Sequence, residues 1–131
     1  MKLEEITNEE LKNHINMAYL HGENNNQEKI NEINEKIGEN ISRNMLITVT
    51  ENDEFLKIPY GNNDEFVIPI FTDNQQLNLG MDYFKLNDME KNKIPKIIET
   101  KEFRKIKENP NFLGLLINIA SVSYIITPEM I

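Results

Sequence analysis

The sequence predicts a single α/β domain of the α+β type, in which an N-terminal helical hairpin packs on a mixed sheet of five to six strands. Apolar residues recur at helical spacing through the first 43 residues, and β-branched runs of strand length follow them. The length of 131 residues is that of one ordinary domain. We therefore expect one domain over 1–131, with the hairpin at 1–43 and a sheet with two helices at 44–131.

The first helix is predicted to begin at Asn8 and to run to about His21. Thr7 is a candidate N-cap residue, because Glu10 stands three residues later and completes a capping box. Gly22 is suited to end the helix in the left-handed conformation.

A second helix follows after a short polar turn, where Asn25 and Glu28 repeat the capping pattern. Its apolar stripe consists of Ile30, Ile33, Ile37 and Ile41. Two amphipathic helices joined in this way form an αα-hairpin, and their apolar stripes need another element to cover them.

The next segment predicts strands separated by turn-forming residues. These strands lie at 45–50, 55–59 and 66–71. Pro69 has no N–H group, so we expect it at a sheet edge or a bulge. Thr72 is the candidate N-cap of a short helix with Gln75 at N3, which ends near Gly80.

The last third predicts further strands and one helix. The strands lie at 94–98, 112–118 and 123–127, and the helix at 101–108. Pro95 disfavours a helix at the residue before it, which is why we predict a strand there. Thr100 is the expected N-cap of the helix, with Phe103 and Ile106 directed inward, and a turn near Ala120 joins the last two strands.

Composition excludes several classes of function. The chain has no cysteine, which removes disulfides and thiolate chemistry and fits a reducing compartment. No apolar run approaches the roughly 18 residues of a membrane span, and the net charge of −8 disfavours nucleic acid as a partner. We expect a cytoplasmic protein that binds neither membrane nor nucleic acid.

The charge is distributed unevenly. Residues 85–107 hold eight bases and four acids. Within this stretch Lys101, Arg104 and Lys105 form a candidate docking patch for an acidic partner, although a charge run of this kind is more often a solvated surface.

Signals for catalysis or cofactor binding are absent from the sequence. His14 and His21 are two helical turns apart and lack a third ligand at zinc-binding spacing. The glycines are isolated, so there is neither a phosphate loop nor a dinucleotide fingerprint, and no serine lies in a nucleophile elbow. We predict no catalytic residues, no metal and no cofactor.

One strand end is a candidate binding rim. Phe71, Thr72 and Asp73 lie where a strand ends and a helix begins, a place where α/β folds often bind ligands. Asn118, at another strand end, can join the same rim. The alternative is structural, with Thr72 capping the helix and Asp73 interacting with the helix dipole.

The second half of the chain resembles the N-terminal domain of the SseB family, named for enhanced serine sensitivity. The resemblance rests on residues 67–73 (VIPIFTD), 108–110 (ENP) and 114–118 (GLLIN), and less specifically on 124–130. It implies a mixed α/β fold, a cytoplasmic setting and no established catalytic activity or cofactor. The family's proline after the asparagine is Ile119 here.

Three functions follow as hypotheses. The first is a non-catalytic protein-interaction or regulatory domain that docks another cytoplasmic protein. The second is a small-molecule-binding or enzymatic domain that uses the rim of Thr72, Asp73 and Asn118. The third is an immunity-type partner of a toxin, for which a small acidic domain is suited. The sequence leaves the oligomeric state open.

Overall fold

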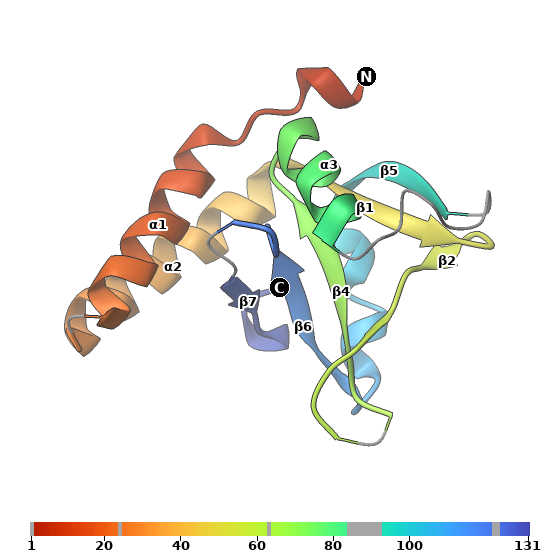
Figure 1. Cartoon of the computed structure of the whole chain (residues 1–131). Coiled ribbons are helices and arrows are strands. Elements are labelled where there is room, and N and C mark those ends of the chain that lie inside the picture. The colour runs from red at the N-terminus through yellow and green to blue at the C-terminus, as the bar shows by residue number, and fades with distance from the viewer. Residues whose placement is uncertain (1, 24, 63, 84–92, 122–123) are drawn as a thin grey trace.

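Three α-helices, seven strands and four 3₁₀ segments occupy the described part of the chain, which in this computed structural model is residues 2–23, 25–62, 64–83, 93–121 and 124–131 (Figure 1). The helices are α1 (Glu9–Glu23), α2 (Gln27–Arg43) and α3 (Asn74–Tyr83). The strands are β1 (Met45–Glu51), β2 (Glu54–Phe55), β3 (Ile58–Pro59), β4 (Phe66–Phe71), β5 (Lys93–Glu99), β6 (Phe112–Ile117) and β7 (Tyr124–Ile126). The 3₁₀ segments are η1 (Leu3–Glu5), η2 (Thr100–Phe103), η3 (Ile106–Glu108) and η4 (Pro128–Met130).

Helix α1 begins one residue later than predicted. The first helical hydrogen bond runs from Lys12 N to the carbonyl oxygen of Asn8, so Asn8 holds the N-cap position and the expectation for Thr7 is wrong. Asn8 has a positive φ of 53°, and its side chain donates to the carbonyl oxygens of Met45 and Thr72 at 2.7 and 2.8 Å. These bonds fasten the start of the hairpin to the sheet.

The turn between the two helices uses asparagine where we expected glycine. Gly22 lies inside α1 with a negative φ, whereas Asn25 has a φ of 59°. Asn26 N donates to the carbonyl of His21 and Asn25 N to that of Gly22, which is the Schellman pattern. Asn26, one residue after the predicted Asn25, caps α2 by accepting from Lys29 N at 3.3 Å.

The sheet is mixed. β1 pairs antiparallel with β5 along its whole length and with β4 at two residue pairs, β4 pairs parallel with β6, and β6 pairs antiparallel with β7. The segment 54–59 is split into two short strands, of which β2 pairs with the end of β1 and β3 with the start of β4. This split explains why there are seven strands where we predicted five to six. In the described chain β5 and β7 each have one strand neighbour.

Pro69 lies in an interior strand, contrary to the expected edge, and its register with β6 is regular. The Phe66 N–H donates to the carbonyl of Asn111, just before β6, and the Ile70 carbonyl accepts from Asn118 N, just after it. Because successive residues of a strand direct their backbone groups to opposite edges, the nitrogen of Pro69 faces the other edge of β4. On that side the partner of β4 changes from β3, at Phe66 and Val67, to β1, at Ile70 and Phe71. The missing N–H therefore falls in a gap of the ladder.

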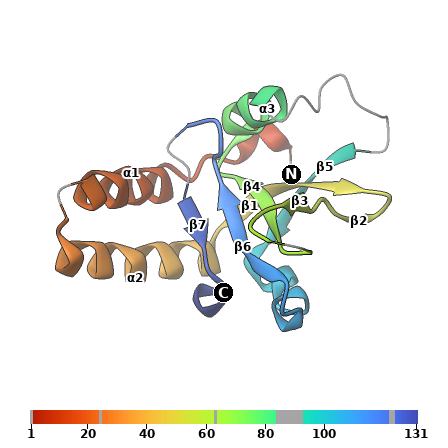
Figure 2. The same ribbon diagram turned by 60° about the horizontal axis from the view of Figure 1, so that its bottom comes forward.

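Two apolar layers cover the two faces of the sheet, which confirms the predicted fold class (Figure 2). The hairpin packs on one face, where its residues Leu11, Ile15, Ile33, Ile37 and Ile41 join Leu46, Ile68, Ile70 and Ile117 of the strands. On the other face α3 places Leu77 against Ile47, Val49 and Phe71. The alternation of inward residues along β1 supplies both layers.

The predicted helix at 101–108 is wrong, because the segment forms two 3₁₀ segments, η2 and η3. Thr100 does not cap a helix. Its buried hydroxyl donates to the carbonyl oxygen of Ile41, while Glu99 and Glu102 form a capping box one residue earlier. Phe103 is buried as predicted, with its ring centroid 4.7 Å from that of Phe55.

Candidate functional site

The ends of β4 and β6 meet at a buried polar pair. Thr72 N donates to Asn118 Oδ1 at 3.1 Å, and Asn118 Nδ2 donates to Thr72 Oγ1 at 3.0 Å. Both side chains are buried, and Asn118 has a φ of 53°, which asparagine tolerates better than most residues. The parallel pairing of the two strands thus unites two of the predicted rim residues and directs their polar groups at each other.

Asp73 caps α3 in place of the expected Thr72. Its Oδ1 accepts from Gln76 N at 2.9 Å, and its Oδ2 accepts from Thr72 Oγ1 at 3.1 Å. The same Oδ2 lies 2.9 Å from Lys12 Nζ. Asp73 therefore joins the end of β4, the start of α3 and the first turn of α1.

Phe71 has a different role from the other rim residues. It is buried against the inner side of α3, where its ring lies close to Gly80. It contributes to the apolar layer under α3 and not to a solvent-facing rim.

Sequence reasoning missed Asn8 and Lys12, which bond to Thr72 and Asp73 from more than 60 residues away. Asn8 was predicted only as the first residue of the helix, and Lys12 stands in no motif. Their proximity depends on how the hairpin crosses the sheet, and the sequence pattern carries no signal for that.

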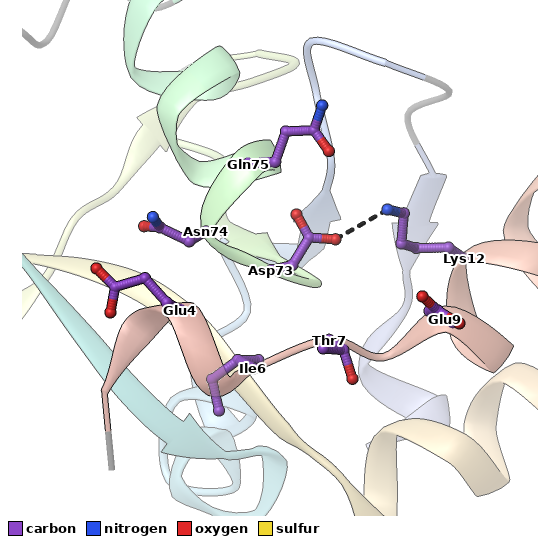
Figure 3. A pocket seen from close by; sticks show the side chains of 8 residues that line it. All are labelled: Glu4, Ile6, Thr7, Glu9, Lys12, Asp73, Asn74 and Gln75. Atoms are coloured by element: carbon purple, nitrogen blue, oxygen red, sulfur yellow. Dashed lines mark ion pairs between the residues drawn. The ribbon is translucent and has the colours of Figure 1, made fainter.

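A shallow pocket of about 320 Å³ lies beside this polar cluster (Figure 3). Figure 3 shows Lys12 reaching from α1 to Asp73 at the start of α3. The other residues lining it are Glu4, Ile6, Thr7, Glu9, Asn74 and Gln75. The one ammonium group among these residues, that of Lys12, is already paired to the carboxylate of Asp73.

The predicted basic patch lies on and just after η2. Lys101, Arg104 and Lys105 are all exposed. Lys101 Nζ is 3.1 Å from a carboxylate oxygen of Glu99, whereas Arg104 and Lys105 form no ion pair with any described residue. The patch therefore holds two cations that remain available to solvent.

A third surface feature, which the sequence did not predict, is a groove of about 410 Å³ between the hairpin and β7. We call it the hairpin groove. Its lining consists of Ile15, Ala18, Tyr19 and Gly22 of α1, Ile30 and Asn34 of α2, and Tyr124, Ile125 and Thr127 in and after β7. The hairpin reaches beyond β7 in both views (Figures 1 and 2).

One hydrogen bond closes one side of the groove. Tyr124 Oη donates to Asn34 Oδ1 and so links β7 to α2. Burial raises the pKa of the Tyr124 phenol above its ordinary value, which keeps it protonated and able to donate.

The histidine and carboxylate side chains of the described chain are not arranged as a metal site. Among the described residues no group of three or more histidine, cysteine, aspartate or glutamate side chains is placed to hold a metal ion. His14 Nε2 lies 3.6 Å from a carboxylate oxygen of Glu10, one turn earlier on α1. His21 is half-buried in the last turn of the same helix.

Comparison with known proteins gives no relative, because no protein-family model, curated protein or solved structure matches the chain. In the part of the chain that the structure describes, no helix is both long enough and apolar enough to cross a membrane.

Proposed function

We propose that this chain is a non-catalytic protein-interaction domain and that the hairpin groove is its docking surface. The observation that carries the proposal is the groove itself, in which the apolar inner side of the hairpin extends past the outer strand of the sheet. We keep the SseB resemblance and a cytoplasmic partner as parts of the same proposal.

The lining of the groove supports an apolar anchor from a partner. Of its apolar lining residues, Ile15 and Ala18 are buried, while Ile30 and Ile125 are half-buried. Tyr19 also lines the groove and is 52 % exposed. Interface centres are typically apolar and enriched in aromatic residues, and a few residues there supply most of the binding energy.

The polar cluster gives weaker support to the small-molecule hypothesis. Thr72, Asp73 and Asn118 bond to one another, to Lys12 and to the start of α3, and Thr72 and Asn118 are buried. A ligand would have to replace these contacts. Such a site costs more to open than the hairpin groove, which is already open.

Site-specific photo-crosslinking in the native host tests the proposal. Tyr19 is replaced by the photoreactive aromatic residue benzoylphenylalanine, which labels a partner that occupies the groove. Tyr60 provides a matched control, because it is 45 % exposed and lies before the turn between β3 and β4. We expect a discrete crosslinked species from position 19 and none from position 60.

The same experiment can reject the proposal. Equal labelling from both positions would indicate nonspecific contact, and no adduct at position 19 would remove the groove as a docking surface. Either result would reject docking through the hairpin groove as the function of the protein.

A further inference from the structure

We infer that the hairpin groove binds an uncharged, apolar segment of a partner protein, and that Asn34 donates a hydrogen bond to a backbone carbonyl of that segment. This inference rests on the proposed function, specifies the chemistry of the partner and names a residue that determines specificity. Two features of the described chain support it: a groove lining without charge, and an amide donor that has no partner.

The groove carries no charge on any of the described residues that line it. These nine residues are aliphatic, aromatic, hydroxyl- or amide-bearing side chains and one glycine, although 27 % of the whole chain is charged. A charged group of an occupant would lose its water there and meet no opposite charge, which is costly. An uncharged occupant avoids this cost, and Ile15, Ala18 and Ile30 offer it apolar surface.

The side-chain amide of Asn34 is only partly used within the fold. Its Oδ1 accepts from Tyr124 Oη, which orients the amide between α2 and β7. In the described chain its Nδ2 donates to no other group, and it is not among the buried polar atoms that lack a partner, so it remains accessible to solvent. The groove therefore contains one oriented donor beside its apolar surface.

A peptide carbonyl is the acceptor that fits this donor. Each residue of a polypeptide carries a backbone carbonyl close to its side chain, so a segment whose apolar side chain enters the groove brings an acceptor with it. The hydroxyl of Thr127 is less suited to this role, because it bonds to the Glu129 carboxylate. A second copy of this chain is disfavoured as the occupant, because each copy has a net charge of −8.

Selection from a library of random peptides tests the partner chemistry on the full chain. Peptides are selected for binding to the wild-type protein and against binding to Gly22→Arg, which places a long charged side chain in the groove lining. This variant should fold, because a Cβ at Gly22 meets nothing within 4 Å, and circular dichroism verifies this. We expect the enriched peptides to share uncharged apolar residues. Replacing one of these by lysine or by glutamate should weaken binding at least about tenfold in both cases.

A pair of matched variants tests the role of Asn34. Asn34→Asp keeps an oxygen that accepts from Tyr124 but replaces the donor with a carboxylate oxygen, so it should weaken binding of the selected peptides at least about tenfold. Asn31→Asp is the control. It makes the same change of charge one turn earlier on α2, at an exposed residue outside the groove lining, and its Oδ1 can still accept from Gln27. It should bind the peptides like the wild-type protein.

Failure of this inference can be told apart from failure of the proposed function. Enriched peptides that depend on lysine, arginine, aspartate or glutamate would overturn the uncharged chemistry and leave docking intact, and equal effects of Asn34→Asp and Asn31→Asp would overturn the role of Asn34. Self-association of the free chain in sedimentation experiments, abolished by Gly22→Arg, would assign the groove to a second copy instead. If no peptide distinguishes wild type from Gly22→Arg, the inferred segment is rejected, and crosslinking from position 19 decides whether the groove docks a protein at all.

Discussion

At the scale of single residues, Gly80 is fixed by the ring of Phe71. A Cβ at position 80 would lie 2.2 Å from Cε1 and 2.8 Å from Cζ of that ring, which is itself buried in the layer under α3. The glycine is therefore required by close packing of α3 on β4. The sequence predicted it as a helix end, because spacing alone does not distinguish a capping glycine from one that makes room for a neighbour.

We expect Gly80→Ala to lower the free energy of unfolding by about 1 to 3 kcal/mol, the usual cost of overpacking a core. Gly22→Ala is the control, since it lies in α1 with open space around it and should be neutral or stabilising by up to about 1 kcal/mol. Urea denaturation followed by circular dichroism measures both. A Gly80→Ala protein as stable as Gly22→Ala would contradict the packing argument.

Residue patterns predicted most of the candidate rim but not its purpose. Strand and cap signals indicated Phe71, Thr72, Asp73 and Asn118, and the structure brings Thr72, Asp73 and Asn118 into one hydrogen-bonded cluster. The pairing of Asn118 with Thr72 N depends on the parallel contact between β4 and β6, which no local pattern encodes. Long-range pairing therefore decides what these side chains do.

At the scale of elements, prediction located the three α-helices and the strands, with β4 correct at both ends, but it misplaced the helix caps. The caps of all three helices lie one residue later than expected, at Asn8, Asn26 and Asp73, because serine, threonine, asparagine and aspartate all satisfy the cap pattern and neighbours in the fold choose among them. The 3₁₀ segments at 100–108 were predicted as one helix capped by Thr100, whose hydroxyl instead donates to the Ile41 carbonyl.

The link between β7 and α2 makes stability depend on pH in the alkaline range. Tyr124 has a pKa raised by burial in the folded chain, whereas an unfolded tyrosine ionises near pH 10. Its contribution to stability is therefore complete below about pH 10 and is lost as the pH rises toward the folded-state pKa.

Comparison with Tyr124→Phe isolates this contribution. The variant loses the hydrogen bond to Asn34, so near neutral pH we expect it to be less stable by about 1 kcal/mol. Above about pH 10 the wild-type chain should lose stability more steeply than the variant, and the difference should shrink. Urea midpoints measured from about pH 8 to about pH 11 check this, and parallel profiles for the two proteins would contradict it.

At the scale of the whole molecule, the strand order and the position of the hairpin were beyond reach of the sequence. Apolar periodicity at Ile33, Ile37 and Ile41 shows that α2 needs a cover, and any sheet face would satisfy it. That the hairpin projects past β7 follows from the path of the whole chain (Figure 1). The sequence could not predict the hairpin groove for the same reason, although it did predict Gly22 as a helix end and Ile30 as part of the apolar stripe of the second helix.

This arrangement predicts unequal local stability within one hairpin. Its base rests on the sheet through Leu11, Ile37 and Ile41, which are fully buried, whereas its turn is open on the groove side. Regions with few buried contacts open locally with less free energy than the core. Amides at 19–22 and 27–31 should therefore exchange with deuterium at least about tenfold faster than those at 37–41, and β4 should exchange slowest.

Hydrogen exchange measured on the free chain and on the adduct crosslinked from position 19 connects this gradient to docking. A segment that fills the hairpin groove should slow exchange in the turn and leave β5, at the other edge of the sheet, unchanged. Uniform slow exchange along the free hairpin would show that the overhang is as stable as the base. The groove would then be a rigid, preformed surface, and binding would involve little ordering of the chain.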